Sequence, residues 1–267
     1  MMYTEQARGG RVIGGLDSCH SAFHPTDAAQ AHTALNHVAE TLLRASDSRA
    51  AFPDIYAVIT RRVAIEVARP GGPFQEPAWI SRLAGRFCVR YLETLRWAMT
   101  ASAQDSGAWT TAYNSAGAAG MPPVQHALLG LSAHINHDLA IGIHATIVEH
   151  GYADDRAMIA RYKHDHDHVN VLLDASIPEA FARLIKRHHC ATTLWLDRAG
   201  RLARWCTMEL LTRWRAQVWV EVEALLEART EAQRARVLRR IGARAARIGA
   251  LLCRPIPDLP RVHAASW

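Results

Sequence analysis

Hydrophobic side chains recur every three or four residues along most of the chain. The segment from residue 76 to about 99 shows this most clearly, because Leu83, Phe87, Tyr91, Leu95 and Ala98 fall on one face of a helix. No segment alternates in the way a half-buried strand does, and no internal repeat or linker is visible. The pattern predicts an all-α protein, a single-domain helical bundle of about eight to ten helices.

Polar capping residues, glycines and prolines predict where the helices begin and end. Thr26 and Asp27 precede the first helix, and Pro122 and Pro123 suit the first turn of a long one. The expected helices cover residues 28–44, 55–68 with Asp54 as its N-cap, 76–99, 109–115, 122–149, 155–173, 178–196, 203–228 and 230–252. The helical domain then spans residues 27–253, between an N-terminal arm (1–26) and a Pro-containing tail (254–267).

Size and cysteine content narrow the class of protein. With 267 residues, 49% of them hydrophobic, the chain can bury one large core. Its five cysteines are odd in number and form no Cys-x-x-Cys pair, which favours reduced thiols over a disulfide framework. No apolar run approaches the roughly 18 residues of a membrane span, and no signal peptide is evident. We therefore expect a cytoplasmic protein with no membrane span.

The net charge of +6 changes this picture little. Much of the positive charge lies in residues 229–247, where Arg229, Arg236, Arg240, Arg244 and Arg247 share one helix face. A solvated basic face is the simplest interpretation, and an anionic partner for this helix stays open as an alternative. We expect no nucleic-acid partner.

The segment HALLGLSAHINHDLAIGIH, residues 126–144, is an apolar helix that carries several candidate metal ligands. His134 and Asp138 are four residues apart, so one helix face can present both to one ion. His126 lies about 12 Å further along the axis at 1.5 Å per residue, which suits a second metal or an acid–base role better. His126, His137 and Asn136 are therefore the catalytic candidates.

A second cluster, KHDHDHVN at residues 163–170, follows on the next helix. If that helix folds back antiparallel to the first, Asp167 or His164 can face His134 and Asp138. The predicted metal ligands are His134, Asp138, His164, Asp167 and His168. Three or four His and carboxylate ligands with one open position are typical of a catalytic zinc or iron site. The competing interpretation is a hydrogen-bonded core histidine pair and a solvated face.

Three classes of function remain open on these residues. The first is a metal-dependent hydrolase in which an ion-bound water attacks a small-molecule substrate and His126 or His137 transfers protons. The second is a non-haem iron oxygenase or a cyclase that acts on a specialised metabolite. The third is a metal-free binding or interaction protein whose polar cluster is a satisfied hydrogen-bond network.

The stretch HALLGLSAHINHDLAIGI resembles the signature of a bacterial family catalogued only as a domain of unknown function. The resemblance extends to FCVRYLETL at residues 87–95, to Asp167 and Asn170, and to Arg215 and Trp219. It implies an α-helical domain from about residue 27 to residue 229 and draws attention to the cluster positions His126, His134, Asn136, Asp138 and Asp167. It implies no activity.

A weaker similarity of spacing links the chain to the zinc phospholipase C and single-strand nuclease superfamily. His134, Asp138 and His144 stand at the spacing of that superfamily's ligands. Its Gly-Asp pair and its N-terminal Trp ligand have no counterpart here.

Overall fold

A computed structural model describes residues 24–99, 107–115, 121–190, 192 and 198–254. The described residues form helices and no strand, so the all-α prediction is confirmed. The helices are α2 (Ala28–Arg44), α3 (Ala51–Ala68), α4 (Pro77–Met99), α5 (Gly107–Ser115), α6 (Pro123–Ala133), α7 (Ala140–Glu149), α8 (Arg156–His188), α10 (Arg201–Glu227) and α11 (Glu231–Leu252). A short 3₁₀ turn (Ser48–Ala50) precedes α3, and the π-helix η2 (His134–Leu139) joins α6 to α7.

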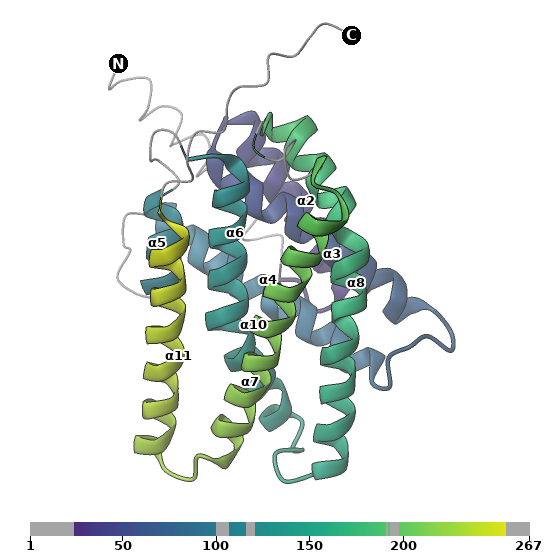
Figure 1. Cartoon of the computed structure of the whole chain (residues 1–267). Coiled ribbons are helices and arrows are strands. Elements are labelled where there is room, and N and C mark those ends of the chain that lie inside the picture. Colours follow the sequence, from purple (N-terminus) through teal and green to yellow (C-terminus); the bar gives the residue numbers. More distant parts are fainter. Residues whose placement is uncertain (1–23, 100–106, 116–120, 191, 193–197, 255–267) are drawn as a thin grey trace, which may run out of the picture.

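The rod formed by α6, η2 and α7 runs through the middle of the bundle. Figure 1 shows α10 and α11 as a hairpin, with α11 beside α6 and α8 on the other side of α10. α3 packs against α2, α6 and α8, and α4 packs against α2 and α7. Two main hydrophobic clusters result, one around α2, α3 and α5 and the other around α4, α7 and α10. The rod contributes side chains to both.

The predicted helix start at residue 28 is confirmed, and the helix expected from residue 122 begins one residue later, at Pro123. The Asp27 carboxylate accepts a hydrogen bond from the backbone N–H of Gln30 at 2.8 Å and so caps α2. Pro123 is the first residue of α6, where its missing N–H leaves no bond unmade. Residues 1–23 and 255–267, which hold most of the expected arm and tail, lie outside the described residues.

The break expected between residues 173 and 178 does not occur, because α8 continues through Pro178. Leu173, Ile177, Ala180 and Leu184 form one buried stripe on both sides of the proline. Helix α8 as a whole packs mainly against α3 and α10. Packing along one continuous face therefore outweighs the loss of a single backbone hydrogen bond at Pro178.

Asp54 does not cap α3 as expected. It lies inside the helix, fully buried, and its carboxylate accepts hydrogen bonds from Arg183 (2.8 Å), Arg187 (2.6 Å) and His188 (3.0 Å) of α8. The side chain of His188 is therefore only 6% exposed, although the charged Lys186 and Arg187 precede it in the sequence. These interactions hold the C-terminal end of α8 against α3.

No helix among the described residues is long and apolar enough to cross a bilayer. The described cysteines, Cys88, Cys190, Cys206 and Cys253, are free thiols.

Candidate functional site

The motif HINHDL forms the π-helical turn η2 in the middle of the rod. Five of its six residues are buried, and His137 is the exception. A π-turn is rare and often occurs at a functional site, because the wider turn changes how neighbouring side chains project from a helix. Two of the five predicted ligands, His134 and Asp138, therefore lie at the one described break in regular α-helix along the rod.

The carboxylate of Asp138 is the centre of this turn. It is fully buried, and each of its oxygens has two nitrogen neighbours. Oδ1 accepts hydrogen bonds from Arg90 Nε and His137 Nδ1, both at 2.9 Å, and Oδ2 accepts one from Trp109 Nε1 at 2.8 Å. His134 Nδ1 lies 3.5 Å from Oδ2. Burial raises the pKa of Asp138, but hydrogen bonds from His134 and His137 and the charge of Arg90 outweigh it, so the pKa falls well below the ordinary value.

His134 lies within a cage of aromatic rings. Its imidazole stacks on Phe87 at a centroid distance of 3.3 Å, and the ring of Tyr56 meets it edge-on at 4.6 Å. Burial lowers the pKa of His134 and the neighbouring Asp138 only partly compensates, so the ring is neutral at pH 7. Because a carboxylate can only accept, the proton of the neutral ring is assigned to Nδ1. Nε2 then carries a lone pair, and it is buried without a hydrogen-bond partner.

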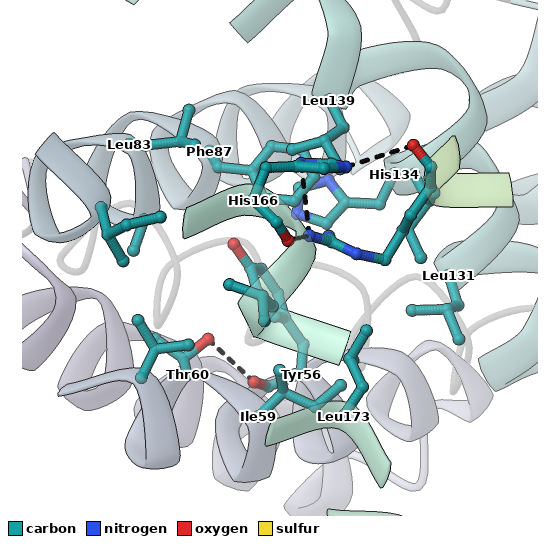
Figure 2. Close-up of a pocket in the computed structure, with 16 residues that line it drawn as sticks. Tyr56, Ile59, Thr60, Leu83, Phe87, Leu131, His134, Leu139, His166 and Leu173 are labelled. Carbon is teal, nitrogen blue, oxygen red and sulfur yellow. Dashed lines mark hydrogen bonds between the residues drawn. The ribbon is translucent and has the colours of Figure 1, made fainter. Parts of the chain in front are cut away.

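A largely apolar cavity of about 90 Å³ adjoins His134 (Figure 2). Its walls come from α3, α4, the rod, α8 and α10, and include Leu83, Phe87, Leu139 and Leu173. Tyr56 also lines it. Its hydroxyl is buried without a hydrogen-bond partner, and burial raises its pKa well above the ordinary value. Two unpaired polar atoms, one acceptor and one donor, thus belong to side chains that line an apolar cavity.

His166 of α8 and Arg215 of α10 form the polar part of the cavity wall. His166 Nε2 donates to the Arg215 carbonyl at 3.1 Å, and its Nδ1 accepts from Arg215 Nη2 at 3.2 Å, as the dashed lines in Figure 2 show. The nearly complete burial of His166, followed by the charge of Arg215, lowers its pKa well below the ordinary value. Both ring nitrogens are therefore engaged, and His166 stays neutral.

Asn136 and His137, expected to be catalytic, have positions that favour structural roles. The Asn136 side-chain oxygen accepts from Arg244 of α11 at 2.9 Å, and its amide donates to Ser132 at 3.0 Å. Arg244 also pairs with the buried Glu221 of α10 at 2.8 Å, so it does not belong to a solvated basic face. The ring of His137 donates its hydrogen bond to the Asp138 carboxylate. Neither residue lines the cavity beside His134.

His126 lies near the start of α6, beside a separate space of about 20 Å³ bounded by Phe52, Trp109 and Gly130. That volume suits about one or two water molecules. The Nδ1 atom of His126 is buried without a hydrogen-bond partner, and burial lowers the pKa of His126. Phe52 packs directly against Gly130, and its ring atoms lie 2.5–2.9 Å from where a Cβ of residue 130 would stand.

The structure does not bring the predicted ligands of the second cluster, His164, Asp167 and His168, to His134 and Asp138. α8 packs mainly against α3 and α10 and not as an antiparallel partner of α7, so the expected hairpin does not form. His164 and Asp167 are exposed, Asp167 pairs with Lys163 at 2.5 Å, and His168 packs edge-on against Phe74. Within the described ranges, no group of three or more His, Cys, Asp or Glu side chains is placed to hold a metal ion.

The buried members of the second cluster are the two that the sequence interpretation passed over. Asp165 accepts the backbone N–H groups of Gln75 (2.8 Å) and Glu76 (2.6 Å) just before α4, and His166 lines the cavity. The helical periodicity of the sequence could have identified both residues, because Tyr162, Val169 and Leu173 lie on the same side of α8 as they do. Tyr56, which no motif marks, was also missed.

Comparison with known proteins gives one match. No curated protein and no solved structure matches the chain, so the spacing similarity to the phospholipase C and nuclease superfamily has no support from these comparisons. A family model described as a family of unknown function, DUF5995, matches residues 28–255. That range includes the rod, both histidine and aspartate clusters and every residue of the cavity wall. The chain is therefore a member of the DUF5995 family.

Proposed function

We propose that the protein is an acid–base enzyme that binds a small, mostly apolar molecule in the cavity and transfers a proton through His134. One observation carries the proposal: the Nε2 lone pair of a buried, neutral histidine is unpaired in an apolar cavity, and a buried carboxylate stands behind the same ring. Leaving such an atom without a partner is unfavourable unless a ligand supplies one.

The three side chains have separate roles in this proposal. His134 Nε2 accepts a proton from the substrate. Asp138, fixed by Arg90, His137 and Trp109, orients the ring and stabilises the imidazolium that forms. Tyr56 stays protonated because burial raises its pKa, so its hydroxyl can donate a hydrogen bond to a substrate oxygen that gains negative charge.

The simplest reaction of this kind is an isomerisation through an enolate. A C–H bond next to a carbonyl breaks, its proton moves to His134 Nε2, and the electron pair moves onto the carbonyl oxygen facing Tyr56. In a substrate whose C=C bond lies β,γ to the carbonyl, the same proton then returns to the γ carbon, the C=C bond moves to the α,β position and the carbonyl re-forms. Atoms and charge balance without a further reactant.

The metal-dependent hydrolase or oxygenase expected from the sequence is a second candidate. The same His134 Nε2 supports it, because a neutral imidazole nitrogen is a common zinc or iron ligand. Asp138 would have to exchange at least one of its hydrogen bonds for the metal, and further ligands would have to move in. Elemental analysis of protein purified without a His-tag tests this candidate, and one equivalent of zinc or iron would favour it over metal-free chemistry.

Proton exchange in heavy water tests the acid–base proposal. Small ketones, such as acetone and 2-butanone, are incubated with the protein in D₂O, and NMR follows deuterium at the carbons next to the carbonyl. We expect exchange above background in the wild type and a loss of about 100-fold or more in His134→Gln, the usual contribution of a positioned base. The matched control is His168→Gln, which alters a histidine outside the cavity and should change nothing. Equal exchange rates in wild type and His134→Gln would refute the assignment.

A further inference from the structure

Arg215 is a charged side chain buried in the wall of an apolar cavity. It comes from α10, it is only 6% exposed, and it lines the same cavity as His134 and Tyr56. Burial lowers its pKa to about 10, so it still carries its positive charge at neutral pH.

The contacts of Arg215 within the described residues are all with neutral groups. Nε donates to the Asn170 side-chain oxygen at 2.7 Å, and Nη2 donates to the backbone carbonyl and the Nδ1 atom of His166. Nη1 donates no hydrogen bond to any described residue. The carboxylate that influences Arg215 is that of Asp167, which is exposed and bonded to Lys163.

The other buried or half-buried arginines of the bundle differ in this respect. Arg244 pairs with Glu221, and Arg183 and Arg187 both pair with Asp54. Moving a charge out of water costs several kcal/mol unless a counter-ion and hydrogen bonds compensate. Arg215 has the hydrogen bonds and no ion pair among the described residues, so the missing part of its environment is an anion.

We propose that Arg215 binds the carboxylate of the ligand, whose short apolar part fills the cavity beside His134. This inference rests on the proposed function, because it concerns the same cavity, and it adds the chemical class of the substrate: a small monocarboxylic acid. Leu83, Phe87 and Leu173 would contact the apolar part, and the free N–H bonds of Arg215 Nη1 would meet a carboxylate oxygen.

The size and lining of the cavity favour a monocarboxylate over a larger or more highly charged anion. The volume is about 90 Å³, whereas an engineered cavity of roughly 150 Å³ holds benzene, so a chain of a few carbon atoms is the expected length. A phosphate ester needs several donors around three oxygens, and Arg215 is the one cationic side chain among the described residues of the lining.

Calorimetric titration with matched acids and alcohols tests the inference. Butanoate and hexanoate are titrated into the protein, with 1-butanol and 1-hexanol as uncharged ligands of the same chain length. We expect the wild type to bind at least one acid tenfold or more tightly than its alcohol. Arg215→Gln should abolish that preference while alcohol affinity stays within about twofold. Arg213→Gln is the matched control, since Arg213 lies on the same helix, exposed and paired with Glu209 at 2.7 Å.

The outcomes separate this inference from the proposed function. Equal affinity of the wild type for acid and alcohol, or an equal loss of both in Arg215→Gln, overturns the carboxylate assignment and leaves acid–base chemistry in the cavity standing. Failure of every acid and alcohol to bind overturns both. If Arg215→Gln does not fold, the wild-type comparison decides, together with Arg215→Lys, which keeps the charge and should retain part of the preference.

Discussion

The histidine and aspartate clusters of η2 and α8 have similar compositions, but different kinds of partner hold their buried members. Asp138 receives hydrogen bonds from side chains of three separate elements, and the neighbouring His134 ring, which has a buried nitrogen without a hydrogen-bond partner, lies at a cavity. Asp165 is buried as deeply, yet it receives two backbone N–H groups at the start of α4. The first carboxylate orients the His134 ring, and the second holds α8 against the segment that precedes α4.

This difference shows that ligand-like composition alone does not identify a site. What separates the clusters is whether a buried polar atom is left without a partner. His134 Nε2 is unpaired, whereas both ring nitrogens of His166 are hydrogen-bonded. Buried polar groups are almost always satisfied, so an unsatisfied one deserves a functional explanation.

Asp138→Asn should have the largest effect of any change in the two clusters. An amide offers one oxygen where the carboxylate offered two, so its NH₂ group faces a donor such as Trp109 or Arg90. We expect a loss of about 3 kcal/mol in the free energy of unfolding, measured by urea denaturation. A variant as stable as the wild type would mean that the hydrogen bonds to Asp138 do not stabilise the fold around η2.

Asp165→Asn tests whether Asp165 holds α8 against the segment before α4. It should lower the free energy of unfolding by about 1–2 kcal/mol, comparable to the loss of a helix cap. One backbone N–H before α4 would lose its acceptor. The control is Asp167→Asn, two residues along the same helix, whose exposed ion pair with Lys163 contributes at most about 1 kcal/mol. Ligand binding in the cavity should survive both changes. Equal unfolding energies for the two variants would contradict the assignment.

The last prediction concerns the pH dependence of the free energy of unfolding. The folded-state pKa of His166 is lowered, so below about pH 6.5 the unfolded chain takes up a proton that the folded protein does not. Stability is therefore lost as the pH falls below 6.5, by at most about 1.4 kcal/mol per pH unit for this group. His166→Gln should reduce the slope of unfolding free energy between pH 7 and pH 5.

The control for this measurement is His168→Gln, whose ring packs on Phe74 at the edge of the core. It should leave the slope as in the wild type. His134 also has a lowered pKa and contributes to the slope in both proteins, so a difference between the two variants reports on His166 alone.

Much of the fold could be predicted from local patterns. The all-α class, the Asp27 cap and the proline start of α6 depend on residues close in sequence, and each is confirmed. The continuation of α8 through Pro178 depends on packing against α3 and α10, which no local signal reports. Asp54 was misassigned for the same reason, because its partners lie about 130 residues further along the chain.

The site could be predicted only in part. His134 and Asp138 were found because two polar residues one turn apart in an apolar run require partners. Tyr56 and Arg215 could not be assigned to the site from spacing, since they come from α3 and α10 and meet His134 only at the cavity. In the second cluster the buried face of α8 was misjudged. The exposed His164 and Asp167 were therefore chosen as candidates in place of the buried Asp165 and His166.

The π-turn also governs how the rod serves two different parts of the core. Leu129 and Ala133, before the turn, join the cluster around α2, α3 and α5, while Ile143 and Ile147, after it, join the cluster around α4 and α10. A π-turn accommodates one residue more than an α-helical turn, because its hydrogen bonds run from residue i to i+5 and not to i+4. If the same six residues formed regular α-helix, everything downstream would rotate by about 100°, so that Ile143 and Ile147 would leave their core and polar neighbours would enter it. Deleting one residue within η2 should therefore disturb the core less than deleting one residue from α6 or α7, because only the first deletion restores a regular helix with the same faces.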